Sequence, residues 1–411
     1  MKITSTRIKG LVAEYGTPMY LYDKQELVSN LQHYHDCFKS SQFDTQVLYA
    51  SKAFSVKRMY ELVQAAKLGV DVVSYGELVT AIKAKVDPQT IYFHGNNKSV
   101  AEITYALKHN IYCFIADNLD ELVDIENLCH KYNKKCNIML RMNVGVEAHT
   151  HRYIVTSHID SKFGILINSK TYDEALKFIN NSKRLNLIGF HSHIGSQIFD
   201  MTAFYAAIDK LIAVLKTQPK PLALNLGGGF GIKYTDEDHP LSIKDYCESI
   251  IKYTEKQLRA NNVTITKLLI EPGRSIVGEA GCQLYTLGNQ KTTANKKYCF
   301  VNGGMSDNIR PALYQAKYSC DVVEKMDRPK NEIYTIAGKC CESGDILIEH
   351  VNLPTITKGD TLIVYSCGAY GYSMASNYNK LEIPCVVFED DGESELVCHR
   401  QNIAELLERE L

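Results

Sequence analysis

Short apolar stretches alternate with amphipathic segments from about residue 24 to residue 275. The apolar stretches are rich in Val, Ile, Leu, Tyr and Phe and have the length of buried strands; they lie at 47–50, 70–73, 91–93, 111–116, 137–142, 187–194, 222–226 and 267–270. The segments between them repeat apolar residues at intervals of three and four, which predicts helices; they lie at 56–68, 76–84, 100–108, 119–132, 172–179, 201–215 and 243–258. Eight strands alternating with helices predict an α/β fold, a parallel (β/α)8 barrel of the TIM type.

The pattern changes after Arg274, where helical periodicity fades. Strand-like stretches then follow one another closely, at 283–288, 298–302, 333–337, 345–348, 361–365, 384–388 and 395–399. Such spacing is typical of an all-β unit. We therefore predict a barrel domain over 24–275 followed by a C-terminal all-β domain over 276–411. An apolar stretch at 19–22 has no place among the barrel strands, so we expect residues 1–23 to pair into the β domain.

Composition excludes several classes of protein. The 411 residues carry 46 Lys and Arg against 47 Asp and Glu, a formal net charge of −1, which favours neither nucleic acid nor an anionic membrane as a partner. No stretch approaches the roughly 18 apolar residues of a membrane span, and the first residues lack the apolar core of a signal peptide. The 13 cysteines are scattered without a Cys-x-x-Cys pair, which indicates neither a disulfide framework nor a zinc ribbon. We expect a cytoplasmic protein.

In a parallel barrel, functional residues collect where the strands end. At those positions the sequence places Lys52, Asp71, Arg141, His191, His193, Ser196, the glycines 227–229 and the run Glu271-Pro272-Gly273-Arg274. Consecutive glycines let backbone N–H groups converge on an anion, and such barrels commonly hold a phosphate between the loops after strands seven and eight. The position of Gly228 and Gly229 after the seventh strand therefore favours a phosphate site over a plain turn.

Lys52 is a candidate nucleophile. A lysine that points into a barrel mouth is costly to bury as an ammonium, and desolvation lowers its pKa so that the amine attacks carbonyl groups. Together with a phosphate cradle and Glu271, this suggests pyridoxal phosphate, whose aldehyde forms an imine with lysine and whose pyridine nitrogen needs an acidic partner. His193 could lie flat on the ring and Asp71 could support it. The alternatives remain open: a solvated lysine, a core histidine, a structural aspartate and a rim pair of Glu271 with Arg274.

The β region adds further candidates. Cys341 and Glu342 place a thiol beside a carboxylate, and a thiol with an adjusted pKa is a competent proton donor. Arg310 and Tyr314 are four positions apart, hence on one face of a short helix that could grip a carboxylate, or else a surface pair. Tyr370 lies in a glycine-flanked tyrosine loop.

A metal site is not predicted. Histidines gather at 149, 151 and 158 and again at 191 and 193, in a long polar connection and at a strand end. Nothing fixes a third ligand and a carboxylate partner for either group. The long connection over 143–170 is typical of a functional lid instead.

Motifs spread along nearly the whole chain resemble one family. They are TPMYLYD (17–23), YASKAFS (49–55), GVDVVSYGEL (69–78), FHGNNKS (93–99), VEAHTHRYIVTSHIDSKFG (146–164), HSHIGSQI (191–198), LNLGGGFGIKY (224–234), EPGRSIVGEAG (271–281), GGMSDNIRPALY (303–314), CESGDIL (341–347) and GAYGYSMASNYN (368–379). In this collinear order they resemble diaminopimelate decarboxylase, of the fold-type III pyridoxal phosphate family that also contains ornithine and arginine decarboxylases. The chain departs from the family's usual residues at Tyr75, Asn302 and 380–384.

The resemblance implies a homodimer with shared active sites and a role for each candidate residue. Lys52 would carry the cofactor imine, His193 would stack on the ring and Glu271 would meet the pyridine nitrogen. The phosphate and the rest of the cofactor would be bound by Asp71, Ser196, Gly228, Gly229, Pro272, Gly273, Arg274 and Tyr370. The substrate would be bound by Arg274, Arg310, Tyr314, Glu342 and Tyr370. Cys341, reaching across from the partner subunit, matches the proton donor.

The predicted activity is the decarboxylation of meso-2,6-diaminopimelate to L-lysine, the last step of lysine biosynthesis, with pyridoxal phosphate as cofactor. The distal ammonium and carboxylate of that substrate call for an acid and an arginine, because a site with buried charges rejects analogues that leave them unpaired. The alternatives are a related basic amino acid or carboxynorspermidine decarboxylase, a racemase, and a non-catalytic regulator. Glu271 argues against the racemase, whose ring nitrogen needs a basic partner; Lys52 and Cys341 argue against the regulator.

Overall fold

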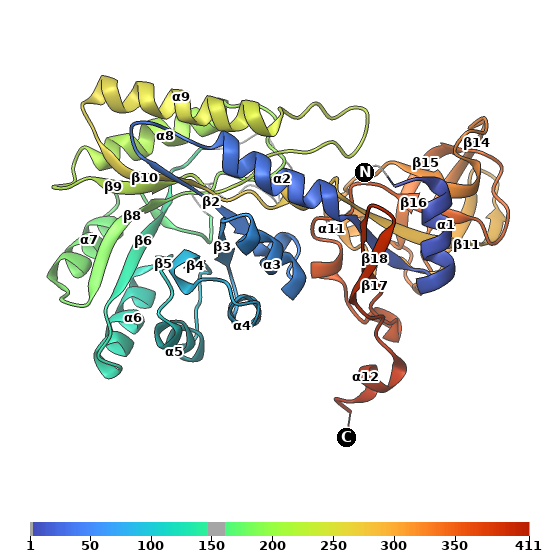
Figure 1. Cartoon of the computed structure of the whole chain (residues 1–411), viewed down its shortest axis with the longest axis horizontal. Helices are drawn as coiled ribbons and strands as arrows, with labels where there is room; N and C mark the ends of the chain where they lie inside the picture. The colour runs from blue at the N-terminus through green and yellow to red at the C-terminus, as the bar shows by residue number, and fades with distance from the viewer. Residues whose placement is uncertain (1–2, 147–160, 411) are drawn as a thin grey trace. The chain divides into compact units, whose positions relative to one another are not determined.

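The computed structural model describes residues 3–146 and 161–410. The chain divides into two compact units (Figure 1). The barrel unit comprises Asn30–Gly231 and Pro240–Ser275, and the β unit comprises Met1–Ser29, Ile232–His239 and Ile276–Leu411. The candidate metal ligands His149, His151 and His158, and most of the predicted lid, lie outside the described residues.

The described part of the barrel unit contains a closed ring of eight parallel strands. They are β2 (Asp44–Ala50), β3 (Gly69–Val72), β4 (Ile91–Phe93), β5 (Cys113–Ala116), β6 (Cys136–Asn143), β8 (Leu185–His191), β9 (Leu222–Asn225) and β10 (Ile265–Ile270). Each strand pairs with the next, β5 pairs with β6, and β10 returns to β2, which closes the ring. The short β7 (Ile165–Leu166) pairs with β6 outside the ring. The predicted TIM-type barrel is therefore confirmed.

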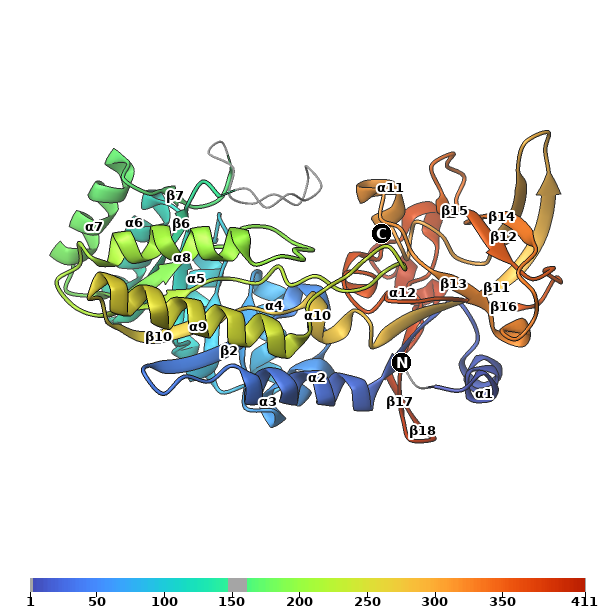
Figure 2. The same cartoon turned by 90° about the horizontal axis from the view of Figure 1, so that it is seen from above.

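Helices surround these strands, as Figure 2 shows for α8 and α9. They are α3 (Lys57–Ala65), α4 (Tyr75–Lys83), α5 (Val100–His109), α6 (Leu119–Lys131), α7 (Lys170–Asn181), α8 (Thr202–Leu215) and α9 (Ile243–Asn261). Local sequence fixes their ends: Ser99 and Glu102 form a reciprocal capping box at the start of α5, and Asn110 ends that helix in the left-handed conformation. The barrel interior is filled by a buried apolar cluster of Leu48, Tyr92, Cys113, Ile115, Met139, Ala223 and Leu269.

The β unit is built on a mixed sheet of β1 (Met19–Asp23), β11 (Gly281–Thr292), β12 (Lys297–Val301), β13 (Cys320–Val322), β14 (Glu332–Ala337), β15 (Ile346–Leu353), β16 (Thr361–Val364), β17 (Cys385–Asp390) and β18 (Glu393–Cys398). Its order is β15-β14-β12-β11-β1-β17-β18, with β16 pairing to β11 and β13. The N-terminal strand β1 runs antiparallel to β11 and parallel to β17, so that Met19 lies opposite both Leu284 and Cys385.

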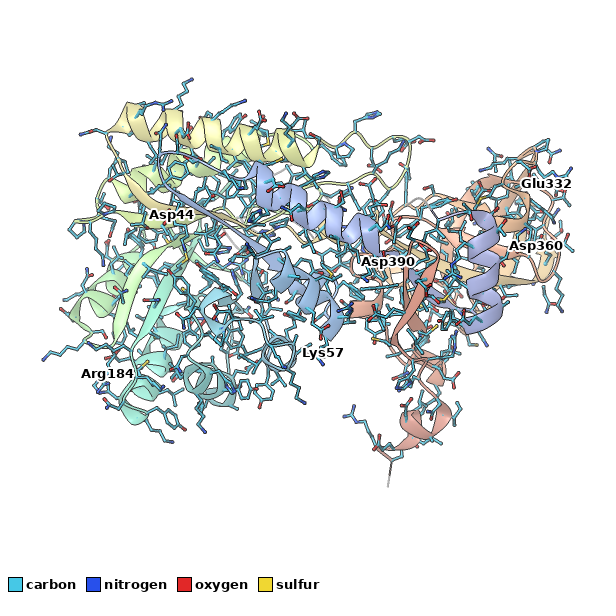
Figure 3. All side chains as sticks on the ribbon, viewed as in Figure 1. Asp44, Lys57, Arg184, Glu332, Asp360 and Asp390 are labelled. Carbon is cyan, nitrogen blue, oxygen red and sulfur yellow. The ribbon has the colours of Figure 1, made fainter. Side chains whose placement is uncertain are left out.

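Several helices escaped the sequence analysis: α1 (Ser5–Tyr15), α2 (Lys24–Cys37) and α12 (Ile403–Leu407). Helix α1 packs onto the sheet through Ile8 and Leu11, its two fully buried residues, beside Met19. Near the first turn of α2, Lys24 forms an ion pair of 2.7 Å with Asp390, which is marked in Figure 3. Among the described residues, no helix has both the length and the apolar content needed to cross a bilayer.

Candidate functional site

A cavity of about 280 Å³ opens among residues that follow the barrel strands. Its walls include Lys52, Asp71, His94, Arg141, His191, His193 and Glu271. The fold thus brings together candidates as far apart in the sequence as Lys52 and Glu271. It does so because the carboxyl ends of parallel strands lie at the same end of the barrel.

Glu271 follows β10 and is only 5% exposed. Its oxygen Oε1 accepts a hydrogen bond of 2.7 Å from Nδ2 of Asn225 and lies 2.9 Å from Nε2 of His94. Its oxygen Oε2 lies 3.2 Å from Nε2 of His191, close enough for a hydrogen bond from that nitrogen. The carboxylate is therefore held by polar groups from three other strand ends.

Electrostatics keeps Glu271 ionised. Burial alone would raise the pKa of this carboxyl. His94 and His191 have the opposite effect on it and hold the pKa well below its ordinary value. Burial lowers the pKa of His191 itself to about 4, so at neutral pH this ring is uncharged and acts as a hydrogen-bond donor. A buried anion that points into a cavity is a suitable partner for a protonated heterocyclic nitrogen.

Asp71, at the end of β3, is a second buried acid in the same wall. Burial raises its pKa to about 6, although His94 opposes the change. Its Oδ1 lies 3.6 Å from Nε2 of His94, and among the described residues this oxygen completes no hydrogen bond. Asp71 therefore leaves a buried acceptor available in the cavity wall, next to His94.

The glycine run after β9 packs so closely that side chains are excluded. A Cβ atom at Gly228 would lie 2.1 Å from the backbone oxygen of Glu271. Gly229 has a φ of +106°, and its Cβ would lie 2.5 Å from the backbone oxygen of Gly195. Only glycine fits such positions. Gly228 is buried and Gly229 half-buried; glycine-rich runs of this kind form concave surfaces that bind anions.

Beside this run, Nη2 of Arg274 donates a hydrogen bond of 2.9 Å to Oγ of Ser196. Pro272 and Gly273, which precede Arg274, are buried, and the backbone oxygen of Pro272 accepts a hydrogen bond from the N–H of Ala50. The loops after β8 and β10 are thus joined by a cation and a hydroxyl, two groups that commonly bind phosphate.

His193 adjoins the same glycines. The backbone N–H of Gly228 donates a hydrogen bond of 3.2 Å to Nδ1 of His193, which assigns the remaining ring proton to Nε2. Burial lowers the pKa of His193 well below its ordinary value, and the positive charges of Lys52 and Arg141 lower it further. The ring is therefore neutral and presents an aromatic face without a competing charge.

Lys52 lies on a short 3-10 turn, Ser51–Ala53, directly after β2. Ser51 is buried, and its Oγ lies 2.7 Å from the backbone oxygen of Asp71 and 2.8 Å from Oε2 of Glu77, two acceptors that share its single proton and fix the turn. Lys52 lines the cavity but is itself exposed. The prediction that Lys52 is buried away from water is therefore wrong for a single chain. The turn directs Ser51 and Ala53 into the core and Lys52 away from it.

The remaining candidates belong to the β unit. Arg310 begins α11 (Arg310–Tyr314) and is buried, and its Nη1 donates hydrogen bonds to the hydroxyls of Tyr234 (3.0 Å) and Tyr318 (2.5 Å). Its guanidinium lies 5.8 Å from the ring centre of Tyr370, and Tyr314 is half-buried on the same helix. The alternative of a surface pair is therefore wrong for Arg310.

Cys341 and Glu342 are exposed on a loop between β14 and β15. The backbone N–H of Cys341 donates a hydrogen bond of 2.7 Å to Asn379, and the carboxylate of Asp345 accepts one of 2.8 Å from the N–H of Cys340. Arg310 therefore lies beside Tyr370, and the loop that carries Cys341 and Glu342 is held by its hydrogen bonds to Asn379 and Asp345.

Sequence reasoning missed His94, Asn225, Tyr234 and Tyr318. His94 and Asn225 lie at the ends of β4 and β9, where the strand-end rule would have found them. His94, His191 and Glu271 place three ligand atoms within 4.8 Å of one another, a set that could also hold a divalent cation. The two tyrosines carry no sequence signal, because only the fold brings them to Arg310.

Comparison with known proteins adds an independent finding. Residues 24–278 match the family model of the pyridoxal binding domain of pyridoxal-dependent decarboxylases. The chain is 46% identical to the diaminopimelate decarboxylase of Bacillus methanolicus over 399 aligned residues, and this alignment covers 96% of this chain and 92% of that protein. It is 44% identical over 407 residues to that of Bacillus subtilis (strain 168), with coverage of 98% and 93%. Diaminopimelate decarboxylase from M. jannaschii, crystallised with L-lysine, has a TM-score of 0.91 at 31% identity and covers 98% of this chain and 94% of its own.

Proposed function

The chain belongs to the diaminopimelate decarboxylase family of pyridoxal-dependent enzymes, and on that premise we propose that it decarboxylates meso-2,6-diaminopimelate to L-lysine in lysine biosynthesis. The reaction depends on pyridoxal phosphate. The observation that carries the proposal is the buried, ionised Glu271, which shares one cavity with Lys52. Resemblance over nearly the full length favours diaminopimelate over other basic amino acids or carboxynorspermidine as the substrate.

The cavity fits this cofactor. The glycine run excludes side chains where a phosphate would lie, and Asp71 leaves a buried acceptor in the wall. Lys52 would hold the cofactor covalently, Glu271 would meet its ring nitrogen and His193 its ring face. The phosphate would be held by Ser196, Gly228, Gly229, Pro272, Gly273 and Arg274. When bound, the cofactor withdraws electrons from the α-carbon of the substrate, so that the adjacent carboxylate can leave as carbon dioxide.

Two side chains of the barrel unit set the protonation state of the site. Glu271, as an anion, would hold a proton on the ring nitrogen of the bound cofactor. His193, which is neutral and oriented by the N–H of Gly228, would cover the face of the ring and exclude water from it. Glu271 is held by the side chains of Asn225 and His191, and His193 by a backbone N–H, before the substrate arrives, which is the arrangement that electrostatic catalysis requires.

The substrate is recognised by charge. Arg310, oriented by two tyrosine hydroxyls, is positioned to bind a carboxylate, with Tyr314 and Tyr370 beside it. Arg274 supplies a second cation and Glu342 an acid for the distal ammonium. A substrate without the distal carboxylate would leave the buried guanidinium of Arg310 without a counter-ion, which disfavours ornithine.

We further propose a homodimer with shared active sites. In this arrangement the exposed Cys341 of one subunit serves the site of its partner, where its thiol donates a proton to the α-carbon after carbon dioxide leaves and regains one from solvent. We place the cofactor-binding domain at 24–275 and the second domain at 276–411 with 1–23, although residues 24–29 and 232–239 pack within the β unit. The enzyme works in the cytoplasm.

The test is carbon dioxide release by the purified holoenzyme from a panel of substrates. We expect release from meso-diaminopimelate and at most traces from ornithine, arginine and carboxynorspermidine. Release from ornithine or arginine alone would refute the substrate, and bound cofactor without any release would indicate a regulator. Sedimentation of the holoenzyme tests the dimer, and mixing Lys52→Ala with Cys341→Ala chains tests the shared sites, because only a mixed dimer would regain one intact site.

A further inference from the structure

We propose that His94 is a positioning residue for Glu271: it occupies one oxygen of the carboxylate and thereby keeps the other oxygen, and the negative charge, available to the ring nitrogen of the cofactor. The inference rests on the proposed function, since it requires that Glu271 meet that nitrogen. It concerns the residue that directly follows β4, a strand that contributes none of the predicted site residues.

The two oxygens of Glu271 differ in what surrounds them. Oε1 has two polar nitrogens close by, Nδ2 of Asn225 at 2.7 Å and Nε2 of His94 at 2.9 Å. Oε2 has one, Nε2 of His191 at 3.2 Å. Oε1 thus has two nitrogens beside it, whereas one is found beside Oε2 among the described residues. Because each carboxylate oxygen accepts about two hydrogen bonds, Oε2 keeps an acceptor position for a group bound in the cavity that Glu271 lines.

The contact between His94 and Glu271 is chiefly electrostatic. Although Nε2 of His94 lies 2.9 Å from Oε1, its direction falls short of a well-aligned hydrogen bond. Two acids converge on this nitrogen, since Asp71 lies 3.6 Å away on its other side. A nitrogen between two carboxylates is the one that carries the ring proton, so His94 presents an N–H to Glu271.

The fold holds His94 in this place. Its backbone N–H donates a hydrogen bond of 2.8 Å to the backbone oxygen of Val72. The next residue, Gly95, has a φ of +113°, and a Cβ there would lie 3.3 Å from the backbone oxygen of Val73. The turn after β4 is therefore a tight one that a side chain at position 95 would strain.

A buried cation fixes the same turn from the other side. Nζ of Lys98 donates hydrogen bonds to the backbone oxygens of Gly95 (2.9 Å) and Ile115 (2.9 Å) and to Oε1 of Glu121 (2.5 Å). The side chains of Lys98 and Glu121 are 2% and 3% exposed. All three ammonium protons thus have acceptors, and β4, β5 and α6 are tied together behind His94.

Without His94, Glu271 loses one of the two histidines that oppose the effect of burial on its pKa. The other groups that face this carboxylate are Asp71, Tyr92, Arg141, His191 and His193. Burial and the charge of Asp71 favour the protonated acid, whereas Arg141 and the contact with His191 favour the carboxylate. Oε1 would keep its hydrogen bond from Asn225, and a proton shared with the ring nitrogen would lie closer to Glu271 than in the wild type.

The experiment reconstitutes four holoenzymes with pyridoxal phosphate labelled with 15N in the ring and records the nitrogen chemical shift. They are the wild type, His94→Leu, which removes the N–H, His94→Gln, which restores one at a similar reach, and Thr254→Val. The last is the matched control, because Thr254 is fully buried in α9 and its hydroxyl has no hydrogen-bond partner among the described residues.

We expect the signal of His94→Leu to move toward that of an unprotonated ring, with kcat lowered at least about tenfold and KM little changed, the scale of one lost hydrogen bond to a charged group. His94→Gln and Thr254→Val should stay near the wild type. A wild-type signal from His94→Leu, or a shift in His94→Gln as large as in His94→Leu, would overturn the proposal. If His94→Leu does not fold, His94→Phe, which keeps a ring without a donor, takes its place. Failure of the proposed function itself would differ, since the wild type would then release no carbon dioxide from diaminopimelate.

Discussion

Removal of the Lys98 ammonium is predicted to destabilise the barrel unit by about 3–5 kcal/mol, because Lys98→Met leaves the carboxylate of Glu121 buried without its partner. The two side chains are 2% and 3% exposed, so water cannot replace the lost cation. The converse variant, Glu121→Leu, strands the ammonium and should cost a similar amount.

The double variant, Lys98→Met with Glu121→Leu, removes both charges. Three backbone groups then lose a partner: the oxygens of Gly95 and Ile115 lose a donor, and the N–H of Asp117 loses its acceptor, Oε2 of Glu121. At about 1 kcal/mol for each, the expected cost is about 3 kcal/mol, no more than that of either single change. The double-mutant cycle should therefore show a coupling of at least about 2 kcal/mol.

The effect also depends on pH in a predictable direction. Burial raises the pKa of Glu121, and the ammonium of Lys98 opposes this rise. In Lys98→Met the opposition is gone, so the pKa of the folded state lies further above that of the unfolded chain. The folded state then binds a proton more tightly than the unfolded state, and stability falls as pH rises above the unfolded pKa. The loss should be larger at about pH 8 than at about pH 5.

Urea unfolding followed by circular dichroism measures these quantities. Lys24→Met is the control, because Lys24 and Asp390 form a pair of similar length, 2.7 Å, whose side chains are 22% and 41% exposed. Its loss should cost at most about 1 kcal/mol. Equal losses in Lys98→Met and Lys24→Met, a coupling near zero, or a penalty independent of pH would refute the assignment of a buried, mutually compensating pair.

Four further changes test the site itself. Glu271→Gln should lower kcat at least about a hundredfold with the fold intact, measured by carbon dioxide release and circular dichroism, because a neutral amide cannot hold the ring proton. Gly228→Ala should weaken cofactor binding, measured by equilibrium dialysis, since its Cβ would lie 2.1 Å from the backbone oxygen of Glu271; unchanged affinity would contradict the cradle. Cys341→Ala should slow turnover while cofactor binding persists, and an unchanged rate would remove its role. Burial lowers the pKa of His191 to about 4, so the unfolded chain binds a proton more readily than the folded one and stability should fall as pH drops from about 6.5 to 4. In His191→Gln this part of the acid sensitivity should disappear, which thermal unfolding across that pH range would show.

The barrel could be predicted from the sequence because its strands are long apolar runs separated by helices with clear periodicity. The ends of the strands were predicted less accurately. The strand predicted at 187–194 ends at His191 in the structure, because the chain must leave the barrel before His193 can reach the glycine run. Helix α1 escaped notice because only Ile8 and Leu11 are fully buried, too few for a periodic signal. Strand β13 has three residues, which is too short to show an alternation.

The site was predictable where strand order determines position and unpredictable where packing does. Lys52, Asp71 and Glu271 follow from the rule that functional groups lie at strand ends. The partners of Arg310 do not, because Tyr234 lies 76 positions away and reaches the guanidinium only through the fold of the β unit. The exposure of Lys52 also could not be foreseen, since it depends on which side chains of a three-residue turn face the core.

The place of β1 between β11 and β17 has a consequence for the order of events on the ribosome. This strand leaves the exit tunnel before the barrel strands, yet the neighbours that Met19 needs, Leu284 and Cys385, emerge only after the whole barrel has been translated. A nascent chain must therefore keep the apolar strand β1 unpaired for most of its synthesis, while the barrel strands that lie between β1 and β11 in the sequence already associate. A chain stalled before Cys385 would display β1 with one edge open, which makes it a ready target for chaperones.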